Sequence, residues 1–138
     1  MTKRLLVVDD VPEIGDFVRR VAESAGYEVR TTVNARAFQD AYRTFDPDVI
    51  ALDLAMPEVD GIELLEALAD EGCRAQLLIV SGFDFGIQQS AARLAEARGL
   101  RIAGIVPKPL RAQRLREILD ALASDADSRP EAESRPSS

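Results

Sequence analysis

Five times along the chain, a short apolar run is followed by a segment whose apolar residues recur at helical spacing. In the first cycle, residues 4–8 form the apolar run before Asp9-Asp10, and residues 14–25 then carry apolar side chains every three or four positions up to Gly26. Such a run indicates a buried strand, and such spacing indicates an amphipathic helix. Five β-α units in a row predict an α/β fold with a parallel sheet and helices on both faces.

The remaining cycles repeat this pattern up to residue 123. We expect strands at residues 4–8, 28–31, 48–53, 76–81 and 102–106. Asn34 is suited to cap the second helix, and the fourth helix is expected to contain Ile87, Ala91, Leu94 and Ala95. From Ser124 the chain has no large apolar residue, so we expect one domain over 1–123 and a disordered tail or linker start over 124–138.

Composition excludes several classes of function. The 138-residue chain has a net charge of -7, which argues against a nonspecific nucleic-acid surface. It contains no histidine, so it offers no imidazole base, metal ligand or phosphohistidine of its own. The single cysteine, Cys73, is expected to be structural. No apolar run approaches the roughly 20 residues of a membrane span, so we expect a cytoplasmic protein without membrane contact.

Polar residues follow four of the expected strands: Asp9-Asp10, Asp53, Ser81 and Lys108. Ligands of open parallel sheets bind at the carboxyl ends of strands, where the strand order reverses. In the flavodoxin-like order 2-1-3-4-5, strands one and three are neighbours at that point, so three carboxylates converge there. Each residue alone is an ordinary turn or capping signal, but their coincidence at four strand ends favours a site.

Converging carboxylates repel one another unless a cation lies among them, and oxygen ligands suit Mg²⁺. Asp53 is the best candidate nucleophile, because a carboxylate forms an acyl phosphate when metal and ammonium neutralise the developing charge. Lys108 would supply that ammonium, and a cis Lys108–Pro109 bond would direct it inward. Ser81 can donate its hydroxyl proton to a phosphoryl oxygen.

Together these residues resemble the receiver domain of bacterial response regulators over about residues 4–123. The motifs are, in chain order, Val7-Val8-Asp9-Asp10, Asp53, Met56-Pro57, Asp60-Gly61, Ser81 and Lys108-Pro109. Their combined spacing is highly specific.

The resemblance implies a signalling switch, and not an enzyme, that catalyses only its own phosphorylation and dephosphorylation. It implies Asp53 as phosphoacceptor, Asp9, Asp10 and the Ala55 carbonyl as further Mg²⁺ ligands, and Lys108 and Ser81 as phosphoryl contacts. It also implies a sensor histidine kinase or histidine phosphotransfer protein as donor, and a changed surface for a downstream protein or output domain. Phosphorylation-dependent homodimers are common in similar proteins.

The chain departs from the family pattern at several positions. Ile105 stands three residues before Lys108, where receivers often have an aromatic side chain that reports phosphorylation. Ala55 and Phe83 stand two residues after Asp53 and Ser81, where polar residues are frequent. The stretch 83–101 is longer than typical and is similar to receivers fused to cyclic-di-GMP phosphodiesterase domains.

Three other functions compete with the switch. A haloacid-dehalogenase-type enzyme needs an acid two residues after its nucleophile, and Ala55 cannot serve. A flavodoxin-like cofactor binder needs a Ser/Thr/Gly-rich phosphate loop after strand one, where Asp9-Asp10 would repel a flavin phosphate. A degenerate receiver would be a docking scaffold only, and the retained acids and Lys108 argue against it.

Overall fold

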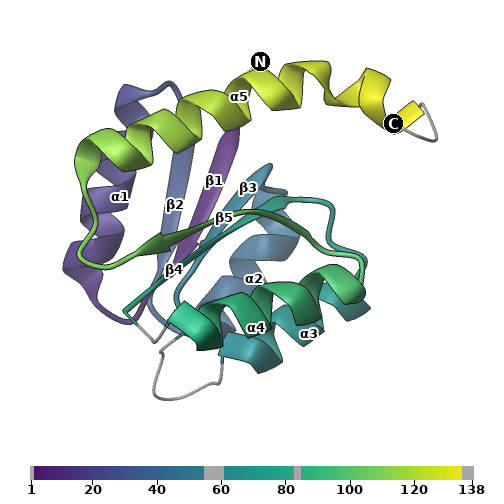
Figure 1. Ribbon diagram of the computed structural model, residues 1–138. Coiled ribbons are helices and arrows are strands. Elements are labelled where there is room, and N and C mark those ends of the chain that lie inside the picture. Colours follow the sequence, from purple (N-terminus) through teal and green to yellow (C-terminus); the bar gives the residue numbers. More distant parts are fainter. Residues whose placement is uncertain (1, 55–60, 83–84, 135–138) are drawn as a thin grey trace.

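The computed structural model describes residues 2–54, 61–82 and 85–134, and most of the side chains in these ranges (Figure 1). The described residues form five strands that alternate with five helices, as the sequence predicts. The elements are β1 (Arg4–Val8), α1 (Pro12–Ser24), β2 (Glu28–Thr32), α2 (Ala35–Phe45), β3 (Val49–Leu52), α3 (Gly61–Asp70), β4 (Gln76–Ser81), α4 (Phe85–Ala97), β5 (Arg101–Pro107) and α5 (Ala112–Ser134).

The strands form one parallel sheet in the order β2-β1-β3-β4-β5, so the predicted flavodoxin-like fold is confirmed. Helices α1 and α5 cover one face, and α2, α3 and α4 cover the other (Figure 1). Side chains alternate along β1, so Leu6 and Val8 pack toward α2, while Leu5 and Val7 pack toward α1 and α5. All four are at most 2% exposed, because both faces of the sheet are covered.

Local sequence signals explain where several of the helices begin or end. The Asn34 side chain accepts a hydrogen bond of 2.8 Å from the Ala37 N–H, which confirms the predicted cap of α2. Gly72 and Gly99, with φ of 71° and 92°, end α3 and α4 in the left-handed conformation that glycine adopts without strain.

The inward face of α4 is not formed by all of its apolar residues. Ala91 and Ala95 are buried, but Leu94 is 38% exposed. The buried Gln88 lies on the same face as Ala91 and Ala95, because positions three and four apart share one side of a helix. Apolar character alone therefore does not show which residues of α4 face the core.

Helix α5 continues to Ser134, and its end projects away from the sheet (Figure 1). Alanine, arginine and glutamate, which recur after Ser124, are strong helix formers, and a helix can continue without burying an apolar face. The division into a domain over residues 1–123 and a disordered tail or linker start over 124–138 stays a prediction. None of the helices formed by described residues is long and apolar enough to cross a membrane.

Candidate functional site

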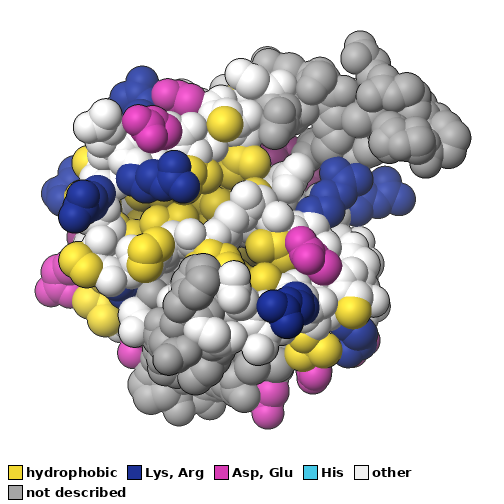
Figure 2. All heavy atoms as spheres, in the orientation of Figure 1, with side chains coloured by type: hydrophobic (Ala, Val, Ile, Leu, Met, Phe, Trp, Pro, Cys, Tyr) yellow, Lys and Arg dark blue, Asp and Glu magenta, His cyan; other side chains and the backbone are white. Residues whose placement is uncertain are grey.

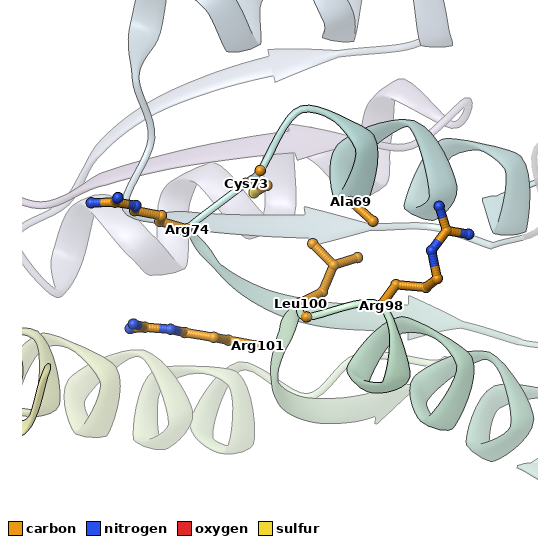
Figure 3. A pocket seen from close by; sticks show the side chains of 8 residues that line it. Ala69, Cys73, Arg74, Arg98, Leu100 and Arg101 are labelled. Atoms are coloured by element: carbon orange, nitrogen blue, oxygen red, sulfur yellow. The ribbon is translucent and has the colours of Figure 1, made fainter. Parts of the chain in front are cut away.

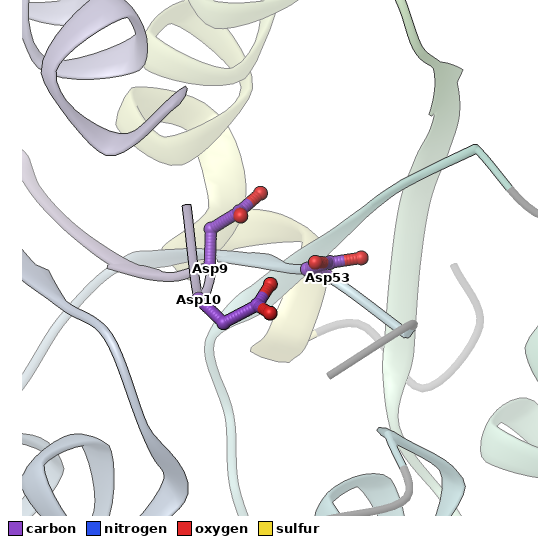
Figure 4. Close-up of side chains that lie close together, drawn as sticks. All are labelled: Asp9, Asp10 and Asp53. Carbon is purple, nitrogen blue, oxygen red and sulfur yellow. The ribbon is translucent and has the colours of Figure 1, made fainter. Parts of the chain in front are cut away.

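Three carboxylates meet at the carboxyl ends of β1 and β3. Asp9 and Asp10 follow β1, and Asp53 follows β3, its neighbour in the sheet, in which Val8 pairs with Leu52. One oxygen from each carboxylate lies within 4.8 Å of the others (Figure 4). The predicted convergence of these residues is confirmed.

Hydrogen bonds hold Asp9 and Asp53 in this position. The Asp9 N–H donates to the Thr32 carbonyl at 3.1 Å, and Asp9 Oδ1 accepts from the Val11 N–H at 2.9 Å. The Asp53 N–H donates to the Val8 carbonyl at 3.1 Å. Both aspartates are buried, whereas Asp10 is half-buried and forms the more open side of the cluster.

Lys108 approaches the same cluster from β5. Its Nζ lies 3.0 Å from Asp9 Oδ2 and 3.4 Å from Asp53 Oδ2. The Lys108–Pro109 peptide bond is cis, which confirms that expectation. Burial lowers the pKa of Lys108, but the hydrogen bond to Asp9 and the charges of Asp53 and Asp9 outweigh this effect and raise it. The side chain is therefore an ammonium ion between two buried carboxylates.

The cluster is rich in carboxylates. Three of them lie close together, and the ammonium group of Lys108 contacts Asp9 and Asp53. Carboxylate oxygens are the ligands that hard divalent cations prefer. Nitrogen and sulfur ligands of zinc sites are lacking, since the sequence has no histidine and Cys73 precedes β4 at the opposite edge of the sheet. The donor set therefore fits a divalent cation such as Mg²⁺.

The other predicted site residues are only partly described. Ser81 ends β4, and its backbone pairs with Pro107, the residue before Lys108, but its side chain lies outside the described part of the structure. Ala55 and Phe83 also lie outside the described residues. The proposed contacts of the Ser81 hydroxyl and the Ala55 carbonyl therefore stay predictions.

The structure adds Thr32 to the surroundings of the site. Its hydroxyl donates to the Val7 carbonyl at 2.7 Å, and its own carbonyl accepts from Asp9, so Thr32 ties the end of β2 to the loop that carries Asp9. The sequence predicts that this strand ends at Thr31, one residue earlier. Thr32 is a polar residue at the end of a strand, and this is the same signal that marks the other site residues.

Comparison with known proteins gives the same answer as this geometry. The family model described as "Response regulator receiver domain" matches residues 5–120. The chain is 28% identical to the chemotaxis protein CheY of Thermotoga maritima, over 89% of this chain and 99% of that protein.

Solved structures agree with this result. The crystal structure of a response regulator from Colwellia psychrerythraea is 31% identical, has a TM-score of 0.78, and is matched over 90% of this chain and 98% of its own. The signal receiver domain of a Luxo repressor protein from Vibrio parahaemolyticus shares the fold, with a TM-score of 0.81 at 18% identity over 96% and 98% of the two chains. The chain thus belongs to the response regulator receiver domain family, a phosphorylation-dependent signalling module whose only chemistry is its own phosphorylation and dephosphorylation.

Proposed function

We propose that Asp53 accepts a phosphoryl group from the phosphohistidine of a sensor histidine kinase or a histidine phosphotransfer protein, with Mg²⁺ held by Asp9, Asp10 and Asp53. The observation that carries this proposal is the position of Lys108, whose ammonium bridges Asp9 and Asp53 inside a cluster of three carboxylates. Since the sequence contains no histidine, the donor histidine lies outside it.

Asp53 has the surroundings that a carboxylate nucleophile needs. Both oxygens of Asp9 already accept hydrogen bonds, one from Val11 and one from Lys108. Asp53 lies beside the same ammonium at the end of the central strand β3. Positive charge on Lys108 offsets the charge that the phosphoryl group brings, as the bond from phosphorus to the donor nitrogen breaks and the bond to the Asp53 oxygen forms.

A bound Mg²⁺ would neutralise charge on the phosphoryl oxygens and on the acidic cluster. Asp9 and Asp10 would hold it from β1, and Asp53 and the Ala55 carbonyl from β3. The resemblance to receivers supports the Ala55 carbonyl and the Ser81 hydroxyl, which we assign as a metal ligand and as a phosphoryl contact.

Phosphorylation would change the face formed by α4, β5 and α5, because Ser81 ends β4 and Lys108 follows β5, the strands that lead into α4 and α5. Figure 2 shows hydrophobic side chains gathered between α4 and α5, with Lys and Arg around them. Leu94, Ile105 and Ile118 contribute partly exposed apolar surface from the three elements. We assign this face to the downstream protein, the output domain or a second phosphorylated copy, in the cytoplasm where histidine kinases act.

Intact-mass analysis after treatment with acetyl phosphate tests the proposal. In Mg²⁺ the protein should gain the mass of one phosphoryl group, and Asp53→Asn should not. Asp40→Asn, an exposed aspartate on α2, is the matched control and should be labelled like the unchanged protein. Labelling of Asp53→Asn, or equal labelling in EDTA and in Mg²⁺, would contradict the assignment.

A further inference from the structure

A pocket of about 490 Å³ lies at the edge of the sheet opposite the acidic cluster (Figure 3). Its lining comes from the end of α3, from the connections that follow α3 and α4, and from the first residue of β5. The lining residues are Ala69, Gly72, Cys73, Arg74, Arg98, Gly99, Leu100 and Arg101. We call it the arginine pocket.

The charge of the arginine pocket is opposite to that of the chain. Arg74, Arg98 and Arg101 line it, and no carboxylate is among the described residues that do so, although the chain has a net charge of -7. In Figure 3, Arg74 and Arg101 extend in the same direction, while Arg98 lies on the other side of Leu100. Arg98 Nη2 contacts Asp70 Oδ1 at 2.9 Å, which leaves other N–H donors of that guanidinium for a ligand.

Several backbone N–H groups of the lining already donate hydrogen bonds. The N–H groups of Cys73 and Leu100 donate to the Leu68 and Ala95 carbonyls, each at 3.0 Å, in the hydrogen bonds that close α3 and α4. The N–H groups of Gly72 and Gly99 also donate to helix carbonyls at 3.0 Å. An anion in the pocket would therefore be recognised by the guanidinium groups.

Helix electrostatics explain only part of this arrangement. The C-termini of α3 and α4 carry partial negative charge, which favours a cation close to each of them. Arg98 and Arg74 satisfy that preference, the first next to α4 and the second after α3. Arg101, at the start of β5, adds a third positively charged side chain to the lining of the same pocket.

We propose that the arginine pocket binds a small organic phosphate, a phosphate monoester of the size of a nucleoside monophosphate. Its volume lies within the ~300–1,000 Å³ of small-molecule sites. Guanidinium forks match the geometry of phosphate oxygens and also stack on planar rings. Space is open at Gly72 and Gly99, where a Cβ would meet no atom within 4 Å.

This site is independent of phosphoryl transfer at Asp53. The arginine pocket lies at the amino ends of β4 and β5, and the acidic cluster at the carboxyl ends of β1 and β3. Binding in EDTA therefore tests the arginine pocket alone, since the acidic cluster needs a divalent cation to hold an anion.

NMR titration of the full chain in EDTA tests the proposal with three probes: AMP, inorganic phosphate and adenosine. AMP should shift the amide resonances of Gly72 and Gly99 and bind more tightly than inorganic phosphate, while adenosine should not bind. The double variant Arg74→Gln/Arg101→Gln should lose about tenfold or more in AMP affinity, because charge-assisted hydrogen bonds are removed. The matched control Arg93→Gln/Arg114→Gln removes two exposed arginines outside the pocket and should bind AMP like the unchanged chain.

A variant that is expected to bind AMP more tightly separates an effect on the pocket from a folding defect, because a folding defect would only weaken binding. Asp70→Asn removes the carboxylate that partly neutralises Arg98, so AMP should bind more tightly to it. Equal losses in the two arginine double variants would show general attraction of anions and overturn the proposal. The proposal would also be overturned if adenosine or inorganic phosphate bound as tightly as AMP, or if AMP bound more weakly to Asp70→Asn than to the unchanged chain.

Discussion

Replacing Asp53 with Asn is expected to stabilise the metal-free protein, although it removes the proposed phosphoacceptor. Asp53 is 2% exposed and lies beside two other carboxylates. At an effective dielectric constant of about 20, unit charges about 5 Å apart repel by about 3 kcal/mol, and Asp53 has two such neighbours. Attraction between the Asp53 carboxylate and Lys108 Nζ, at 3.4 Å, offsets about 5 kcal/mol of this repulsion by the same relation. The balance is a destabilisation of about 1 to 2 kcal/mol, which the neutral amide would remove.

Urea unfolding in EDTA measures this effect. With a slope of about 2 kcal/mol per molar urea, Asp53→Asn should raise the unfolding midpoint by roughly 0.5 to 1 M. The control Asp40→Asn removes an exposed charge and should change the free energy of unfolding by less than about 0.5 kcal/mol.

Added Mg²⁺ should then narrow the difference in stability between the two proteins. A ligand at about ten times its dissociation constant stabilises the folded state by about 1.4 kcal/mol, and Asp53→Asn keeps fewer charged ligands for the cation. A midpoint in EDTA that is lower for Asp53→Asn than for the unchanged chain would refute the electrostatic reasoning. An equal gain from Mg²⁺ in both proteins would refute the role of Asp53 in the metal site.

Three further changes test other parts of the structure. Lys108→Met leaves the carboxylates of Asp9 and Asp53 without their ammonium partner, so urea unfolding in EDTA should show a loss of about 3 kcal/mol. Asn34→Ala should cost about 1 kcal/mol in thermal unfolding, while Asn34→Asp, which keeps an accepting oxygen for the Ala37 N–H, should cost much less. The Tyr27 hydroxyl donates to the Leu119 carbonyl at 2.7 Å, and burial with the charges of Asp120 and Asp48 raises the pKa of Tyr27 to about 12. Because the unfolded chain ionises this group near its ordinary pKa of 10.0, the stability that Tyr27 adds over Tyr27→Phe, about 1 kcal/mol at neutral pH, should decline between about pH 10 and 12. A constant difference across that range would argue against the buried hydroxyl.

Much of the site could be predicted from the sequence because its residues lie directly after strands. Asp9, Asp10, Asp53 and Lys108 each follow a strand whose apolar run is visible in the sequence, and parallel strands bring their carboxyl ends to one edge. The approach of Lys108 to Asp53 was predicted, but its shorter contact with Asp9 was not. It depends on the distance between the ends of β5, β1 and β3 in a twisted sheet, which no local pattern encodes.

The sequence by itself determined the class of fold and the chemistry available to it. Apolar periodicity and chain order lead to five parallel β-α units, and the residue types after the strands supply carboxylates and an ammonium but no imidazole. Tertiary structure alone decided which face of α4 is buried, since Gln88 and not Leu94 lies against the core. It also placed Arg74 and Arg101 at one pocket, because residues far apart in the chain become neighbours only when β4 and β5 pair. Patterns of neighbouring residues reflect the local preference for helix, strand or turn. Charge balance and cavities, in contrast, depend on contacts between segments that are distant in the sequence.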